Sequence, residues 1–283
     1  MASPMRIELH DVSLAYDGIV ALGGLTASVE GRVVGLLGAN GSGKTSLLQI
    51  LAGLKPPTSG RVLLNNEEVA VGRKPWVSYL PQETGFFPFA QLPSHTLSMS
   101  LAFRGIVDPE APHRLLEAMG LADEDRSAEG YSGGMKQKLR IAQALVYKPK
   151  LLLLDEPTTG LDIRERFRVL RLMERLREIV DVVFSTHQPE DVTVVCDQVA
   201  ILQRGRIAAC GSPPEVSRKA EGKVFEVLLP GDALPYGVDW EVVGANRTDE
   251  GLWVRGVGAP PPGARPVMPT LRDAYLLLTR VEA

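Results

Sequence analysis

The sequence is poor in the features that mark secreted and membrane-spanning proteins. Its 283 residues include only two cysteines, Cys196 and Cys210, which are too few for a disulfide framework, so reduced thiols are expected. No apolar run approaches the ~18 residues that a membrane-spanning helix requires. The first ten residues, MASPMRIELH, lack the apolar segment of a signal peptide. A cytoplasmic protein is therefore expected, and another chain would have to supply any membrane span.

The sequence also lacks an excess of basic residues. It contains 31 Lys and Arg against 34 Asp and Glu, for a net charge of −3. Proteins that coat nucleic acid usually carry a basic excess, so no nucleic-acid partner is expected. Its 45% hydrophobic and 23% charged residues are ordinary for a globular protein. The length allows one large domain, or one domain with an appendage.

One glycine-rich segment carries the strongest functional signal. GANGSGKT matches G-x-x-x-x-G-K-[ST], with a buried-strand pattern at 32–37 before it and a helical pattern at 46–52 after it. Glycines let the backbone wrap around phosphate, and the helix adds its positive N-terminal end. A chance glycine turn needs no Lys-Thr pair at a helix start, so we predict a nucleoside triphosphate site, with Lys44 at the β- and γ-phosphates and Thr45 on Mg²⁺. The predicted phosphate-binding residues are Gly38, Asn40, Gly41, Ser42, Gly43, Lys44, Thr45 and Ser46.

Hydrophobic periodicity predicts an α/β protein with a helical insertion. Strand patterns dominate residues 6–37, and the periodicity becomes helical after about residue 83, with prolines between the segments. Strand and helix patterns then alternate, and a small unit of strands and one helix follows after about residue 215. Helices are predicted at 132–147, 163–180 and 271–278, and strands at 62–64, 77–80, 151–154, 182–185, 199–202, 224–228 and 252–255.

Two carboxylates follow the strand pattern LLLL at 151–154. A carboxylate at the C-terminal end of a parallel strand lies near the phosphate-binding edge of a doubly wound sheet. Asp155 could hold Mg²⁺, directly or through water, and Glu156 could polarise an attacking water. Taken alone, the same pattern also fits a strand with an acidic end, but the phosphate-binding segment upstream favours the nucleotide site.

A short glycine motif, YSGGMKQ, begins the helix that precedes the acidic strand. Ser132 could be an ordinary N-cap, and Gly133 and Gly134 an ordinary turn. With this motif the chain resembles the ATP-binding cassette family, the nucleotide-binding subunits of ABC transporters, over roughly residues 6–215. The motifs of the resemblance are, in order, GANGSGKT, Gln82 in YLPQE, YSGGMKQ, LLLLDEP, TGLD ending at Asp162, and His187 in STH. Tyr16 matches the aromatic residue that stacks on adenine in this family.

The resemblance implies a fold and its division. The expected fold is an α/β P-loop NTPase cassette with a mixed core sheet, an N-terminal antiparallel β subdomain and a helical insertion. The ATP-binding domain would cover residues 5–215, with its helical subdomain at about 83–145. Residues 216–283 would form a small C-terminal α+β extension.

The resemblance also implies a chemical reaction and its partners. Two cassettes, identical or different, would bind two ATP molecules head to tail, with Ser132, Gly133 and Gly134 of each touching the ATP of the other. The expected activity is ATP hydrolysis coupled to transport through integral membrane permease subunits, on the inner face of the cell membrane.

Four further residues have roles only by this resemblance. Glu156 resembles the general base, and His187 the switch residue that contacts the γ-phosphate. Gln82 resembles the residue that contacts Mg²⁺ or the water and relays the nucleotide state to the membrane partner. Asp162 resembles the residue that couples the two sites.

The branch of the family is indicated by weaker signals. The tail PTLRDAYLLLTR, the form YSGGM and the segment STHQPEDV are similar to ATPases of ABC-2-type exporters. The segment FFPFAQLPSHTLSMS is unusual for that branch. A non-transport cassette acting on ribosomes or DNA is the alternative, although such proteins usually carry two cassettes or long coiled coils. A P-loop kinase or GTPase would leave the glycine motif and His187 without a role.

Overall fold

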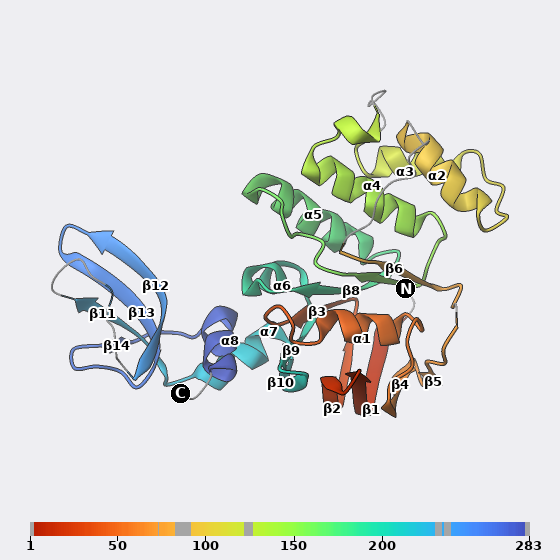
Figure 1. Ribbon diagram of the computed structural model, residues 1–283. Helices are drawn as coiled ribbons and strands as arrows, with labels where there is room; N and C mark the ends of the chain where they lie inside the picture. Colours follow the sequence, from red (N-terminus) through yellow and green to blue (C-terminus); the bar gives the residue numbers. More distant parts are fainter. Residues whose placement is uncertain are drawn as a thin grey trace.

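The computed structural model describes residues 3–72, 74–82, 92–121, 127–229, 234 and 239–280. The parts of the predicted helical region at 83–91 and 122–126 lie outside these residues. Figure 1 shows a body with a helical layer on one side and a separate sheet at the end of the chain. Within the described residues, no helix is both long and apolar enough to cross a membrane.

The central sheet is mixed, as the sequence predicts. Within the described residues its order is β10-β9-β3-β8-β7-β6, and β10 alone runs antiparallel to its neighbour. The inner strands β3, β7 and β8 are buried at every position, because helices or a second sheet cover both faces. The strands are β3 (Val33–Leu37), β6 (Val77–Leu80), β7 (Leu151–Leu154), β8 (Asp181–Thr186), β9 (Gln198–Gln203) and β10 (Arg206–Gly211).

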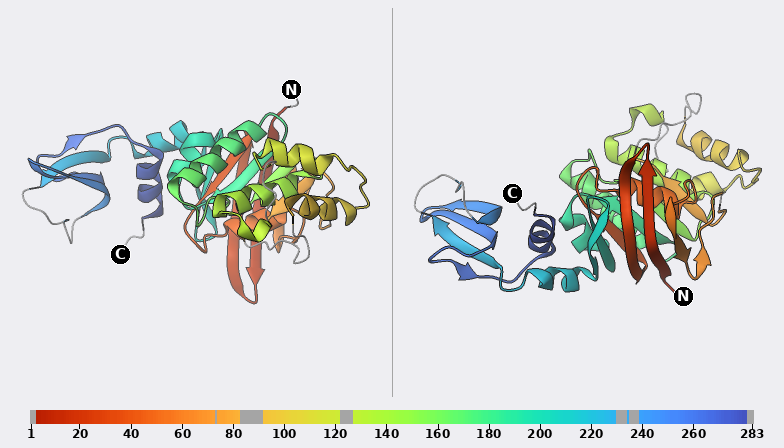
Figure 2. Two further views of the ribbon diagram at one scale, coloured as in Figure 1. Left: turned by 90° about the horizontal axis from the view of Figure 1, so that it is seen from above. Right: turned by 60° about the horizontal axis from the view of Figure 1, so that its bottom comes forward.

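An antiparallel sheet at the N-terminus packs with the first helix. The strands β1 and β2 form a long hairpin, whose turn residues Asp17 and Gly18 both have positive φ, as a tight primed turn requires. Figure 2 shows these red strands as a layer beside the central sheet. The elements are β1 (Met5–Tyr16), β2 (Ile19–Gly31), β4 (Ser59–Leu64), β5 (Glu67–Glu68) and the helix α1 (Lys44–Leu51).

A helical layer lies on the other side of the central sheet. The helix predicted over 163–180 ends at Leu176, because the chain then forms a tighter turn, in which the Ile179 N–H donates to the Leu176 carbonyl oxygen, before it enters β8. The helix predicted over 132–147 spans Gly133–Leu145, with Ser132 as its N-cap. The helices are α2 (Pro93–Ala102), α3 (Ala111–Ala118), α4 (Gly133–Leu145) and α5 (Ile163–Leu176), with a 3₁₀ turn at Ala128–Gly130.

The C-terminal region forms an antiparallel sheet and a final helix. The sheet order is β12-β13-β11-β14, and the helix α8 packs against α6 and α7 of the cassette (Figure 2). The cassette helices that α8 contacts are α6 (Pro189–Val195) and α7 (Pro213–Ser217). The elements that follow them are β11 (Val224–Leu229), β12 (Trp240–Thr248), β13 (Gly251–Gly258), β14 (Arg265–Pro266) and α8 (Leu271–Thr279), with a 3₁₀ turn at Arg218–Ala220.

Candidate active site

The glycine-rich segment leaves β3 and turns into α1 around a cavity of about 350 Å³. Gly41 and Gly43 have φ of 76° and 104°, which L side chains rarely adopt. A Cβ on Gly43 would lie 2.6 Å from Leu22 Cδ2, so only glycine fits there. The predicted residues that line the cavity are Asn40, Gly41, Gly43, Lys44, Thr45, Ser46, Gln82 and Glu156.

Two predicted phosphate-binding residues lie deeper in the same segment. Ser42 is buried, and its hydroxyl has no hydrogen-bond partner among the described residues. A Cβ on Gly38 would lie 2.5 Å from the Ser42 Oγ and from the Leu202 carbonyl oxygen. The tight packing of Gly38 fixes the loop, and the unpartnered hydroxyl leaves a donor that an oxygen-rich ligand would satisfy.

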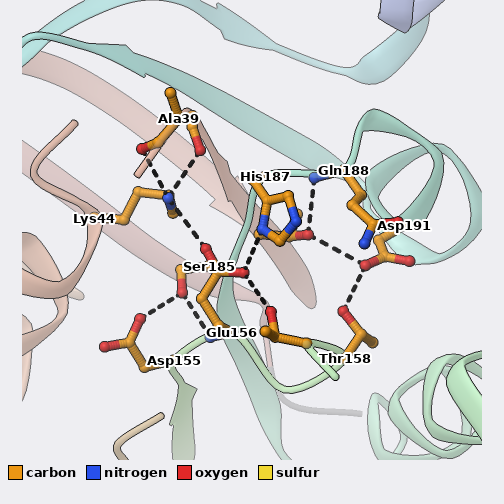
Figure 3. A network of polar contacts seen from close by, with 12 residues as sticks. Ala39, Lys44, Asp155, Glu156, Thr158, Ser185, His187, Gln188 and Asp191 are labelled. Carbon is orange, nitrogen blue, oxygen red and sulfur yellow. Dashed lines mark hydrogen bonds and ion pairs between the residues drawn. The ribbon is translucent and has the colours of Figure 1, made fainter. Parts of the chain in front are cut away.

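A buried lysine and a buried glutamate meet beside the cavity. Lys44 donates to the carbonyl oxygens of Gly38 (2.8 Å) and Ala39 (3.1 Å), and its Nζ lies 3.1 Å from Glu156 Oε1 (Figure 3). The other carboxylate oxygen, Oε2, lies 2.9 Å from His187 Nδ1. Because an ionised carboxylate only accepts hydrogen bonds, Nδ1 carries the hydrogen. The fold thus brings together three predicted site residues that are far apart in the sequence.

The surroundings of Glu156 keep it ionised. Burial by itself raises the pKa of this carboxyl, but the nearby Lys44 ammonium and the hydrogen bonds from His187 and Thr159 outweigh it and lower the pKa. The backbone of Glu156 has φ of 49°, an unfavourable conformation for a residue with a side chain. Its N–H donates to Ser185 Oγ at 2.8 Å, which holds the backbone in place. Strain of this kind is typical of functional sites.

Asp155 is fixed by two hydroxyl groups behind the cavity. Ser185 donates to Oδ1 (2.6 Å) and Tyr79 donates to Oδ2 (3.2 Å). Burial of the Tyr79 phenol, and then the charge and hydrogen bond of Asp155, raise the pKa of Tyr79, so it remains a donor. Among the described residues, no cluster of three or more His, Cys, Asp or Glu could hold a metal ion.

The glycine motif and Asp162 lie away from this cavity. Ser132 and Asp162 are the exposed N-caps of α4 and α5, and each accepts a hydrogen bond from a backbone N–H of its own helix. Gly133 is exposed as well, whereas Gly134 is buried against Glu165 of α5. None of these four predicted residues lines the cavity that contains Lys44.

Tyr16 lies at the edge of the site. Its hydroxyl is 3.3 Å from Ser46 Oγ at the start of α1, and the Lys55 ammonium lies 4.2 Å from the centre of its ring. The ring does not line the cavity that contains Lys44. Its predicted stacking on adenine stays a prediction.

Sequence reasoning missed several polar residues that support the site. Ser185 holds both Asp155 and Glu156, and Thr159 donates to Glu156 Oε2 at 2.9 Å. Asp191 is fully buried and contacts Thr158 and Thr186. The sequence does show polar residues at the ends of the buried strands β7 and β8, which could have indicated that these residues support the site. It does not show which of them bond to one another, because that depends on which strands are neighbours in the sheet.

Comparison with known proteins gives the family. A model described as "ABC transporter" matches residues 25–159. An uncharacterised ABC transporter ATP-binding protein, YxlF of Bacillus subtilis, is 41% identical over 208 residues, covering 71% of this chain and 68% of that protein. A sulfate/thiosulfate import ATP-binding protein, CysA of Nitrosomonas europaea, is 35% identical and covers 79% and 66%. A linearmycin resistance ATP-binding protein, LnrL of Bacillus subtilis, is 29% identical and covers 80% and 75%.

Solved structures share the cassette fold. The structure of cbiO1 from Clostridium perfringens, part of the ABC transporter complex cbiONQ, matches with a TM-score of 0.67 and 27% identity, over 76% of this chain and 91% of that chain. The ATP-binding subunit of another ABC transporter matches with a TM-score of 0.64 and 28% identity, over 75% and 92%. The expected fold class is confirmed. Together with the site around Lys44 and Glu156, these likenesses establish that the chain belongs to the ABC transporter family, as an ATP-binding subunit that hydrolyses ATP to drive transport.

Proposed function

We propose that two cassettes close head to tail on two ATP molecules, and that Glu156 is the general base for hydrolysis in each. The observation that carries this proposal is the position of the Glu156 carboxylate, held between Lys44 (3.1 Å) and His187 (2.9 Å) on the wall of the phosphate cavity. A carboxylate accepts the proton of a water that attacks phosphorus. Lys44 would bind the β- and γ-phosphates, and His187 would contact the γ-phosphate and orient the water.

The oxygen atoms near the cavity fit a magnesium ion. Thr45 and Gln82 line the cavity, and Asp155 is fixed behind it by Ser185 and Tyr79. Mg²⁺ prefers oxygen ligands and is usually held by one or two carboxylates with substrate phosphates. We infer that Thr45, Gln82 and Asp155 hold it, directly or through water. Mg²⁺ bound there would neutralise charge on the phosphate oxygens.

The start of α4 suits contact with the ATP of a second cassette. Ser132 and Gly133 are exposed, and the first N–H groups of a helix favour an anion. Charge-assisted hydrogen bonds of this kind contribute roughly 1.5–3 kcal/mol each. Because hydrolysis would remove several of them together, closure of the pair would depend on an intact γ-phosphate. Asp162 is exposed on the same side at the start of α5 and would couple the two sites.

The substitution Glu156→Gln tests the proposed base. It keeps the size of the side chain and removes the carboxylate, so ATP turnover should nearly cease while ATP still binds. An ATP-dependent dimer should then persist, measured by light scattering after gel filtration. The exposed Glu178 provides the control, because Glu178→Gln should hydrolyse ATP like the wild type. Hydrolysis at the wild-type rate by Glu156→Gln would remove Glu156 from this role.

A second cavity supports docking of a membrane subunit. It measures about 580 Å³ and lies between the segment that follows α1, the strand β6 and the helix α4. Leu80 and Pro81 line it, while the next residue, Gln82, lines the nucleotide cavity. A permease segment seated there would contact the chain directly beside Gln82, which would relay the nucleotide state. We therefore propose a peripheral position on the inner face of the cell membrane, with residues 5–215 as the ATP-binding domain and residues 216–283 as an extension.

We further propose that the transporter is an exporter of the ABC-2 type. The tail PTLRDAYLLLTR and the forms YSGGM and STHQPEDV support this branch. LnrL is named for resistance to linearmycin, which is compatible with export. CysA is named for import, which is the opposite direction. Affinity purification of the full chain from detergent-solubilised membranes should recover an integral membrane protein of this type. Recovery of ribosomes or DNA in place of a membrane protein would contradict the proposal.

A further inference from the structure

A buried carboxylate outside the nucleotide cavity joins three segments of the site. Asp191 lies in the first turn of α6 and is fully buried. Its Oδ1 accepts a hydrogen bond from Arg166 Nε at 2.6 Å. Its Oδ2 accepts from Thr158 Oγ1 at 2.7 Å and from Thr186 Oγ1 at 3.2 Å (Figure 3). A single carboxylate therefore holds three donors from three different parts of the chain.

Two of these donors lie next to residues that contact Glu156. Thr186 directly precedes His187, and its hydroxyl also accepts the backbone N–H of Gln188 at 3.1 Å. The peptide on both sides of His187 is thereby fixed. Thr158 directly precedes Thr159, whose hydroxyl donates to Glu156 Oε2 at 2.9 Å.

The third donor reaches the segment proposed to meet the second cassette. Arg166 lies in the first turn of α5, and its N–H donates to the carbonyl oxygen of Asp162, the N-cap of that helix. A displacement of Asp162 would thus move Arg166 and pull on the carboxylate of Asp191.

We propose that Asp191 is a positioning residue for ATP hydrolysis, which holds His187 and Thr159 against Glu156 and links them to Asp162. A purely structural buried ion pair would need only the arginine. Here the same carboxylate also accepts from the hydroxyl groups of Thr158 and Thr186. These two residues directly precede Thr159 and His187, which both contact Glu156. Because a displacement of about 1 Å at a reacting group can lower a rate by about 10²-fold, rigid support of this kind affects turnover directly. The inference rests on the proposed role of Glu156.

The test uses substitutions that remove single hydrogen bonds from the full-length protein. Asp191→Asn keeps the shape but places an amide NH₂ where only acceptors are needed. Thr158→Val keeps the shape of Thr158 and removes its hydroxyl, whereas Thr158→Ser keeps the hydroxyl. We expect Asp191→Asn and Thr158→Val to lower kcat by about 10- to 100-fold with little change in the KM for ATP. Thr158→Ser should restore most of the lost kcat.

A matched carboxylate lies at the opposite end of the strand β8. Asp181 pairs with Arg32 at 3.0 Å and begins the strand that ends at Thr186. Asp181→Asn should leave kcat unchanged, although it also removes a largely buried ion pair. Combining Asp191→Asn with His187→Ala should lower kcat by less than the product of the two separate effects, since part of the effect of Asp191 passes through His187.

The results separate this inference from the proposed function. Wild-type kcat in both Asp191→Asn and Thr158→Val, or an equal loss of kcat in Asp181→Asn, would overturn the role of Asp191 while Glu156→Gln still abolishes turnover. Full activity of Glu156→Gln would overturn both proposals. If Asp191→Asn does not fold, as judged by circular dichroism, the comparison of Thr158→Val with Thr158→Ser decides the question.

Discussion

At the scale of single residues, the buried Asp273 of the C-terminal extension accepts hydrogen bonds at both carboxylate oxygens. Arg255 donates to Asp273 Oδ1 (2.9 Å) and Oδ2 (2.7 Å), and Thr270 donates to Oδ2 through its backbone N–H and its hydroxyl. Burial opposes ionisation, but these hydrogen bonds outweigh it and lower the pKa of Asp273. The charged form of Asp273 therefore stabilises the junction of β13 and α8.

Replacing this acid should destabilise the protein in a pH-dependent way. Because the pKa of Asp273 is lower in the folded protein than its unfolded value of about 3.9, its contribution is fully present above that pH. The contribution is lost as the pH falls through the folded pKa. Removal of one partner from a buried pair costs roughly 3 kcal/mol or more, so Asp273→Asn should lower the free energy of unfolding by about that amount at pH 7.

Urea unfolding of wild type and Asp273→Asn between pH 3 and pH 7 measures this effect. The difference between them should shrink below about pH 4. Asp249→Asn, at an exposed turn of the same region, is the control and should unfold like the wild type. A difference that stays constant across the whole range would show that the charge of Asp273 is not its cause.

At the scale of secondary structure elements, the helices α4 and α5 meet closely at their first turns. A Cβ built on Gly134 would lie 1.9 Å from Glu165 Oε2 and 2.8 Å from its Cγ. The whole Glu165 side chain would therefore have to rotate, and it would leave its ion pair with Arg168. A Cβ on Gly133 would meet only Leu161 Cδ2, at 3.4 Å. Two neighbouring glycines of the same motif thus differ in the space around them.

The two glycines should respond differently to alanine. Gly134→Ala should lower the free energy of unfolding by about 1–3 kcal/mol, because it overpacks the contact between the helices. Gly133→Ala should leave it unchanged or raise it slightly, since alanine favours a helix over glycine by about 1 kcal/mol. Guanidinium unfolding of both variants measures the difference. Equal effects of the two substitutions would contradict this explanation.

At the scale of the whole molecule, the cassette and the C-terminal extension share one apolar core. The helix α8 packs against α6, the helix that follows His187. Buried residues from both regions form a single cluster. Its members include Leu37, Val192, Val199 and Ile201 of the cassette, and Val224, Val243, Val257, Leu271 and Ala274 of the extension.

A shared core predicts that the two regions unfold together. Leu271 is 2% exposed, and Leu271→Ala should lower the stability by about 2–5 kcal/mol. Calorimetry should show one transition at a lower temperature for this variant. The control is Met268→Ala, because Met268 is 83% exposed. Separate melting of a destabilised extension and an unchanged cassette would show that the two regions unfold independently.

The sequence alone was enough to predict the elements whose signal is local. The segment from Gly38 to Thr45 needs glycine at strained backbone positions, and the strand at 151–154 is apolar at every position before two carboxylates. Both signals depend on covalent geometry and on periodicity, which act within a few residues. The cassette fold followed from the order of these motifs. The end of α5 at Leu176, four residues before the predicted end, depended on where β8 must join the sheet.

Only the tertiary structure decided which side chains meet. Lys44 begins the helix that follows β3, Glu156 follows β7 and His187 follows β8, and their contacts exist because these strands are neighbours in the sheet. No sequence pattern predicts the three hydrogen bonds to Asp191 or the close contact of Gly134 with Glu165. Hydrogen bonds and steric contacts act over a few ångströms in space, whereas periodicity reports only on neighbours along the chain.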